Sequence, residues 1–169
     1  MKVEIWILII SIIITIILLW KFIPRNKILD AHISFLFMQV LTWLFGSIVS
    51  EEKLIVYPVR FMEYAYRVSF TFEYFIFPAV SAIYNVNFHR LNNVKYKVGY
   101  MFFFPSIISG TEAILEKYTD VIKYIHWAWY WSWITIFITL QLSYWYYLWF
   151  MKKMKVKFTI ENEDSSSME

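Results

Sequence analysis

The sequence contains no cysteine, and only three of its 169 residues are glycine and four are proline. The missing cysteine excludes disulfide bonds and thiolate chemistry. So few glycines and prolines exclude a glycine-rich phosphate loop and a low-complexity linker. The sequence has no HExxH, GxSxG or paired-aspartate motif, and His32, His89 and His126 fall in different predicted loops or helix ends. The pattern predicts no catalytic residues, no metal site and no cofactor.

What the chain has in abundance is apolar and aromatic surface. Sixty per cent of the residues are hydrophobic and 22% are aromatic. A soluble domain of this length hides only part of such a surface, so the surplus is expected to face lipid. The net charge of +3 is small, and the basic residues gather beside hydrophobic stretches, which indicates membrane orientation rather than nucleic-acid binding. We therefore expect the lipid bilayer as partner and no nucleic acid.

Five hydrophobic stretches are predicted to cross the membrane as helices. A helix rises about 1.5 Å per residue, so roughly 20 residues span the hydrocarbon layer. The first stretch is long and rich in isoleucine, and no small-residue cleavage site follows it, so we interpret it as a retained span rather than a signal peptide. The predicted spans cover about residues 5–23, 31–49, 68–88, 98–115 and 127–150. Residues 1–153 thus form an all-α, five-helix transmembrane domain, and residues 154–169 are predicted to be a disordered cytoplasmic tail.

The third stretch is expected to be the one around which the others pack. Residues 58–88 are predicted to form one helix of roughly 46 Å, whose first two turns lie among the lipid headgroups. This helix would carry Glu63 and Arg67, which are four residues apart, the usual spacing of a helical ion pair. It also carries Glu73, which the other spans should shield from lipid because a charge there is costly.

The distribution of lysine and arginine predicts the orientation. Every second loop is basic, whereas the alternate loops mix basic residues with Glu51, Glu52, Glu116 and Asp120. Positive loops stay in the cytoplasm, so the N-terminus is predicted to lie outside and the C-terminus inside. The basic segments contain Lys21, Arg25 and Lys27, then Arg90, Lys95 and Lys97, and in the tail Lys152, Lys153, Lys155 and Lys157.

A candidate polar intramembrane cluster combines Arg67, Glu73, Glu112 and His126. With this orientation, both carboxylates would sit roughly 8–9 Å below the outer surface, with Arg67 and His126 near the same level. A functional interpretation makes Glu73 and Glu112 a proton or cation site. The structural interpretation, which we favour, is that they bond to Arg67, His126 or tyrosine hydroxyls and hold the helices together.

Two prolines inside spans, Pro78 and Pro105, are predicted to kink their helices. Such prolines act either as hinges or as static kinks whose freed carbonyls bond to neighbouring helices, and the second use is the commoner. Small residues one turn apart on the fourth span favour close helix packing within the chain or in a homo-oligomer: Ser106 with Gly110, and Ser109 with Ala113.

Sparse aromatic motifs run along the chain to about Lys153. They are Trp20 with Ile23-Pro24, then Arg67…Tyr74…Pro78, then Glu112…Glu116…Tyr118…Tyr124…Trp127-Ala128-Trp129. In these motifs the chain resembles a family of small multi-pass membrane proteins of spore-forming Gram-positive bacteria. The resemblance implies the fold and a bacterial cytoplasmic membrane, and it implies no activity and no catalytic residue.

Three classes of function fit the sequence. A non-enzymatic subunit, scaffold or sensor component, working with a membrane-protein partner, suits the small size, the lack of catalytic motifs and the basic tail. A small transporter or channel-like protein would use Glu73 and Glu112. A membrane enzyme acting on lipids would use Glu73 or Glu112 as a base. We favour the first class.

Overall fold

The computed structural model describes residues 3–166, and the side chains of residues 3–154. This part of the chain contains the helices α1 (Val3–Phe22), α2 (Ile28–Glu51), α3 (Phe77–Phe88), α4 (Val94–Tyr118) and α5 (Trp129–Ser166). A 3-10 turn, η1 (Arg25–Lys27), precedes α2, and a π-helical turn, η2 (Phe72–Ile76), leads into α3. The two-residue strands β1 (Ile55–Val56) and β2 (Lys123–Tyr124) pair antiparallel, with Ile55 opposite Tyr124. The predicted all-α class is confirmed.

Three segments are long and apolar enough to cross a membrane: Val3–Phe22, Arg25–Glu51 and Val94–Tyr118. They correspond to the first, second and fourth predicted spans. By itself α3 has only 12 residues, although helix runs unbroken from residue 70 to residue 88 when η2 is included. The first part of α5 is rich in tryptophan and tyrosine, which lower its mean hydropathy.

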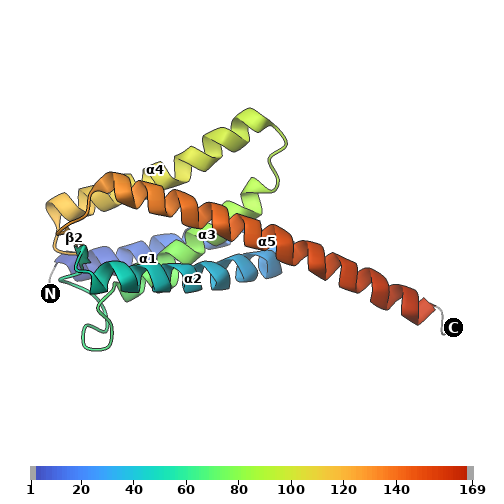
Figure 1. Ribbon diagram of the computed structural model, residues 1–169, viewed down its shortest axis with the longest axis horizontal. Coiled ribbons are helices and arrows are strands. Elements are labelled where there is room, and N and C mark those ends of the chain that lie inside the picture. The colour runs from blue at the N-terminus through green and yellow to red at the C-terminus, as the bar shows by residue number, and fades with distance from the viewer. Residues whose placement is uncertain (1–2, 167–169) are drawn as a thin grey trace.

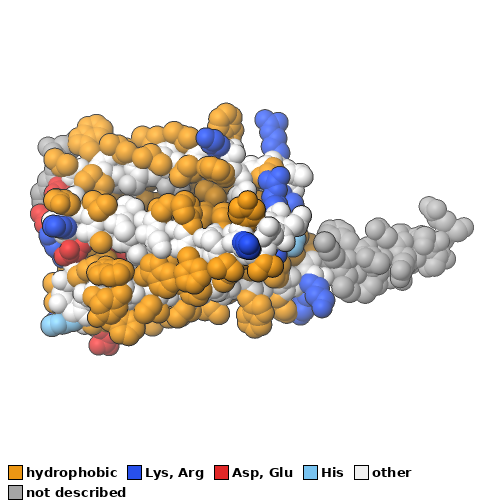
Figure 2. Space-filling view, turned by 90° about the horizontal axis from the view of Figure 1, so that it is seen from above, with side chains coloured by type: hydrophobic (Ala, Val, Ile, Leu, Met, Phe, Trp, Pro, Cys, Tyr) orange, Lys and Arg blue, Asp and Glu red, His pale blue; other side chains and the backbone are white. Residues whose placement is uncertain are grey.

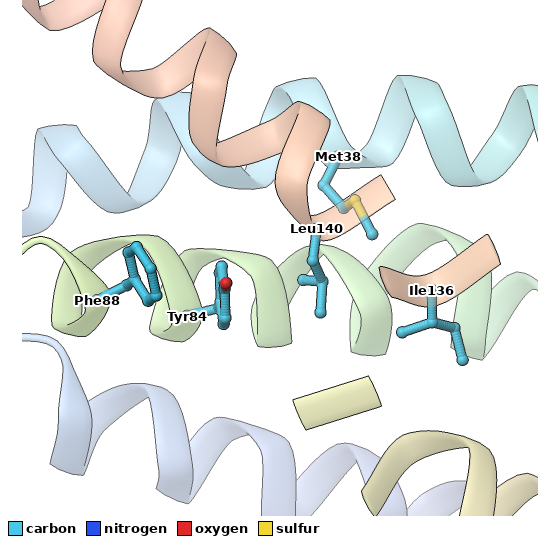
Figure 3. Close-up of a cluster of buried hydrophobic side chains, with 5 residues drawn as sticks. All are labelled: Met38, Tyr84, Phe88, Ile136 and Leu140. Atoms are coloured by element: carbon cyan, nitrogen blue, oxygen red, sulfur yellow. The ribbon is translucent and has the colours of Figure 1, made fainter. Parts of the chain in front are cut away.

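The most buried helix is α3. Nine of its 12 residues are buried, whereas only Leu8 and Thr15 are buried on α1. It packs against α1, α2, α4 and α5, and in Figure 1 it runs between them. The main apolar cluster joins α3 to α2 and α5, with Tyr84 fully buried at its centre (Figure 3). The members of this cluster are Met38, Tyr84, Phe88, Ile136 and Leu140.

The prediction of one long helix over residues 58–88 is wrong for its first third. Residues 57–69 form an irregular loop that follows β1, and helix begins only at Phe70. Pro58 has no N–H to bond, and the amide of Val59 instead donates to the carbonyl of Asp120 at 3.2 Å, beside the β1–β2 pair.

The side chain of Arg60 stabilises this loop. Its guanidinium donates to the carbonyls of Tyr57 at 2.6 Å, Tyr66 at 2.7 Å and Glu63 at 3.1 Å. In a helix, backbone amides would donate to such carbonyls, whereas here one guanidinium donates to all three. Met62 adopts a left-handed conformation, with φ 59°, which no α-helix contains.

The predicted helical ion pair between Glu63 and Arg67 is therefore absent. Arg67 Nη1 donates instead to Glu51 Oε2 at 2.8 Å, at the end of α2. Both side chains are more than two-thirds exposed. The spacing of four residues brings side chains together only on a helix, and residues 61–67 are not helical.

The tail also differs from its prediction. Helix α5 continues to Ser166, so the segment 154–166 that was expected to be disordered is helical, and residues 167–169 lie outside the described part. No proline or glycine interrupts residues 151–166, so the register of α5 can continue. Figure 1 shows α5 projecting beyond the other helices.

The two ends of the bundle differ in charge. The α1–α2 and α3–α4 connections lie at the end from which α5 projects, where basic side chains gather in Figure 2. The acidic side chains visible in Figure 2 lie at the opposite end, with the β1–β2 strand pair. The basic end carries Lys21, Arg25, Lys27, Arg90, Lys95, Lys97, Lys152 and Lys153, and its acidic residue Asp30 is buried against Lys27 and Tyr147.

Candidate functional site

The backbone around Glu73 is shaped by Pro78. A proline has no N–H, so it cannot bond the carbonyl of Tyr74, four residues earlier, or that of Glu73, five residues earlier in the π-helical register. Both carbonyls are bonded from α2 instead: Gln39 Nε2 donates to Tyr74 at 3.0 Å, and Thr42 Oγ1 donates to Glu73 at 2.6 Å. A neighbouring helix thus holds the kink in place.

The side chain of Glu73 lies against Gly46. It is only 5% exposed, and a Cβ atom at Gly46 would lie 2.8 Å from Glu73 Cδ and 3.0 Å from Glu73 Oε1. No residue with a side chain fits at position 46 without displacing the carboxylate. From the loop above, the hydroxyl of Tyr57 donates to Glu73 Oε1 at 3.3 Å.

The second carboxylate, Glu112, lies beside Tyr124 of strand β2 and close to Ser132 of α5. The hydroxyl of Tyr124 donates to Glu112 Oε2 at 3.3 Å and lies 3.2 Å from Ser132 Oγ. Ser132 also accepts a hydrogen bond of 2.9 Å from Trp127 Nε1. Each carboxylate thus has a tyrosine hydroxyl beside it, one next to β1 and one on β2.

Glu73 and Glu112 line one cavity of about 100 Å³, which we call the carboxylate cavity. On the side of the β1–β2 strand pair, the cavity is lined by Ile55, Tyr57 and Trp127. Its remaining polar side chains are the hydroxyls of Thr42, Ser132, Thr135 and Thr139. This volume has room for a few waters or a small cation, and it is smaller than the pockets of roughly 300–1,000 Å³ that bind organic ligands.

The charge state of the tyrosine beside Glu73 follows from its surroundings. Burial raises the pKa of Tyr57 well above its usual range, and the nearby carboxylates of Glu73 and Glu112 raise it further. The phenol therefore stays neutral and acts as a donor to Glu73.

Only two of the four residues predicted to form the polar cluster share the cavity. Arg67 is exposed and pairs with Glu51. His126 is exposed in the connection before α5, where its amide donates to the carbonyl of Leu54 at 3.2 Å. The second predicted kink residue, Pro105, is buried within α4, and the helix continues through it to Tyr118.

Sequence reasoning missed the residues that support the carboxylates. The span predicted over residues 31–49 contains Gly46 without assigning it a role, and Tyr57 lies just before the helix predicted over residues 58–88. The available signal was that Gly46 is one of three glycines and interrupts an apolar stretch. No sequence pattern marks the hydroxyl groups near the carboxylates, because those contacts join segments that are distant in the chain. These hydroxyls belong to Tyr57, Tyr124 and Ser132.

Comparison with known proteins gives no match: no family model, no curated protein and no solved structure is similar to this chain.

Proposed function

We propose that the chain is a multi-pass protein of a bacterial cytoplasmic membrane, with five spans, an external N-terminus and a cytoplasmic C-terminus. Three helices have the length and apolar character to cross a membrane, and residues 70–88 and α5 pack alongside them. The lipid-facing surface of α1 is isoleucine-rich, with Ile10, Ile13 and Ile17 each about half exposed. The basic end then lies in the cytoplasm and the β1–β2 strand pair lies outside.

Because the chain has no cysteine, its topology can be mapped with single introduced thiols. A membrane-impermeant maleimide should label Glu52→Cys in intact cells and should label Asn92→Cys only after the cells are opened. If intact cells label Asn92→Cys but not Glu52→Cys, the orientation is opposite to the one proposed. If they label both variants, the two positions lie on the same side of the membrane and the five-span arrangement is wrong.

Within this membrane protein, we propose that the carboxylate cavity binds a proton or a small cation. The observation that carries this proposal is that Glu73 and Glu112, from different helices, line one small cavity. Two negative charges confined together away from water are costly, and a bound proton or cation removes much of that cost. Each carboxylate has one tyrosine donor, which leaves oxygen lone pairs for the bound ion.

Such a site suits a sensor or transport component. In a sensor, ion occupancy would change how α3 and α4 pack on either side of the cavity, and a partner protein would respond to that change. In a transporter or channel, the same ion would cross the membrane through the cavity.

Infrared difference spectra of the purified protein, recorded between about pH 6 and alkaline pH and with Na⁺ or K⁺ added, test for binding, because ordinary exposed carboxyl groups are already ionised throughout that range. The carboxyl band of the wild type should change, and Glu73→Gln and Glu112→Gln should each remove part of that change. Glu63→Gln, in an exposed turn, is the matched control and should leave it intact. A spectrum insensitive to both cavity variants would overturn the proposal.

Proteoliposomes containing a pH-sensitive dye separate the two roles. Dissipation of a pH gradient by the wild type but not by Glu73→Gln would favour transport. Ion binding without flux would favour a sensor.

A further inference from the structure

A second and larger hollow lies at the other end of the bundle, among α1, α2 and α3. Its volume is about 1,040 Å³, and we call it the basic groove. Its rim is formed where α1 turns into α2 and where α3 ends, and it carries Lys21, Arg25 and Arg90. Asn87 links the two sides, since its side-chain amide donates to the carbonyl of Phe22 at 3.2 Å and to that of Ile83 at 2.8 Å.

The rim has positive charge without a carboxylate to balance it. Among residues 3–154, the ion pairs join Lys27 to Asp30, Arg67 to Glu51 and Lys123 to Asp120, and none includes Lys21, Arg25 or Arg90. Arg25 and Arg90 are exposed, so their guanidinium groups are available to an anion. A guanidinium binds two oxygens of one phosphate at once, which makes arginine well suited to phosphate recognition.

Below the rim, the walls are mainly apolar, with His32 on α2 and Asn87 on α3 as their polar side chains. On α2, the wall extends from Ile28 to Leu36, and eight residues of helix cover about 12 Å. On α3, Ala82 lies eight residues before Arg90, so the opposite wall extends by about the same 12 Å. An inorganic anion would use the rim and leave these walls empty, whereas a molecule with a charged head and an apolar chain would contact both.

We propose that the basic groove binds one anionic glycerophospholipid. Arg25 and Arg90 hold its phosphate, and the walls at Leu36 and Ala82 hold the upper part of an acyl chain. The groove opens at the end of the bundle with the clustered lysines and arginines, the end expected to face the anionic leaflet of the cytoplasmic side. This inference rests on the proposed membrane insertion and not on ion binding by the carboxylate cavity.

Native mass spectrometry of the full-length protein, purified in detergent with equal amounts of phosphatidylglycerol and phosphatidylcholine, tests the proposal. The wild type should retain one phosphatidylglycerol in preference to phosphatidylcholine. The double variant Arg25→Gln/Arg90→Gln should lower that retention roughly 25-fold, since each basic residue near an anionic lipid strengthens binding about fivefold.

A matched control keeps the change in charge but moves it away from the groove. Lys95→Gln/Lys97→Gln removes two positive charges from the same end of the bundle at positions that do not line the groove. It should leave retention within about twofold of the wild type. Equal losses in the two double variants would show that only general surface charge attracts the lipid, and would overturn the proposal.

One further variant and one competition experiment complete the test. Arg25→Lys/Arg90→Lys keeps the charge but loses the paired hydrogen bonds, so its retention should fall between those of the wild type and the glutamine variant, provided that circular dichroism shows all variants folded. Inorganic phosphate at millimolar concentration should not displace the lipid. Displacement by phosphate would show a site for inorganic anions, and equal retention of phosphatidylcholine would show no preference for anionic lipid. Either result would overturn the proposal.

Discussion

Gly46 on α2 and Glu73 in the π-helical turn before α3 are in direct contact, and the glycine leaves the space that the carboxylate fills. A Cβ atom at position 46 would meet Glu73 Cδ at 2.8 Å. Thr42 and Gln39 bond the backbone of this turn to α2, so a Cβ atom at position 46 would displace the side chain of Glu73, whose Oε1 accepts a hydrogen bond from Tyr57. The position of one carboxylate of the cavity is thus determined by the helix opposite it.

Gly46→Ala is expected to destabilise the protein by about 1–3 kcal/mol, since the added methyl group overpacks a buried contact. Thermal unfolding in detergent measures the effect. The control is Gly110→Ala on α4, where an added Cβ meets nothing within 4 Å. This control should be neutral or stabilising, because alanine favours helix over glycine. Equal effects of the two substitutions would contradict the importance of the Gly46–Glu73 contact.

Thr42→Val is expected to cost about 1–3 kcal/mol, because it leaves the carbonyl of Glu73 buried without its donor. Valine has nearly the shape of threonine, so the loss measures the hydrogen bond. Thr111→Val on α4 is the matched control, since Thr111 is exposed and its hydroxyl bonds only the carbonyl of Ile107 in its own helix. A difference in melting temperature should separate the two variants, and no difference would show that the Pro78 kink needs no support from α2.

Arg60→Leu should destabilise the loop over residues 57–69 by about 2 kcal/mol or more, because three carbonyls lose a charged donor. Arg67→Leu should cost about 1 kcal/mol or less, because its pair with Glu51 is exposed. Limited proteolysis of the folded protein should show faster cleavage between α2 and α3 for the Arg60 variant. If Arg67→Leu proves the more damaging of the two, the loop is not organised as described.

The stability of the protein is expected to fall at alkaline pH partly through Tyr57. Its pKa is higher in the folded protein than in the unfolded chain, because burial and Glu73 disfavour the phenolate. Below the unfolded-state pKa of about 10 this contribution is complete, and it is lost as the pH rises from there toward the folded-state value.

Tyr57→Phe should therefore flatten the fall in stability above about pH 10. Denaturation midpoints measured across alkaline pH test this expectation. Tyr64→Phe, at a side chain that is 98% exposed, is the matched control and should reproduce the wild-type profile. A profile for Tyr57→Phe identical to that of the wild type would show that Tyr57 does not carry this dependence.

The sequence by itself determined the helical class and the positions of most helices. Long apolar stretches can satisfy their backbone polar groups only by forming helices when they face lipid, and this reasoning needs no knowledge of contacts. It placed Glu73 and Glu112 at similar depth, which the shared cavity agrees with. It also identified α3 as the helix to be surrounded, since ionisable residues in an apolar helix need shielding.

Only the tertiary structure decided what surrounds the carboxylates. Arg67 has helical spacing to Glu63, but this segment forms a loop in which Arg60 bonds the carbonyls of Glu63 and Tyr66. Arg67 therefore pairs with Glu51 instead. Tyr57 and Tyr124 reach Glu73 and Glu112 because β1 pairs with β2, strands that are about 65 residues apart in sequence. Propensity and periodicity act over a few residues. The pairing of strands and the fit of Gly46 against Glu73 depend on packing between segments distant in the chain, which no local pattern encodes.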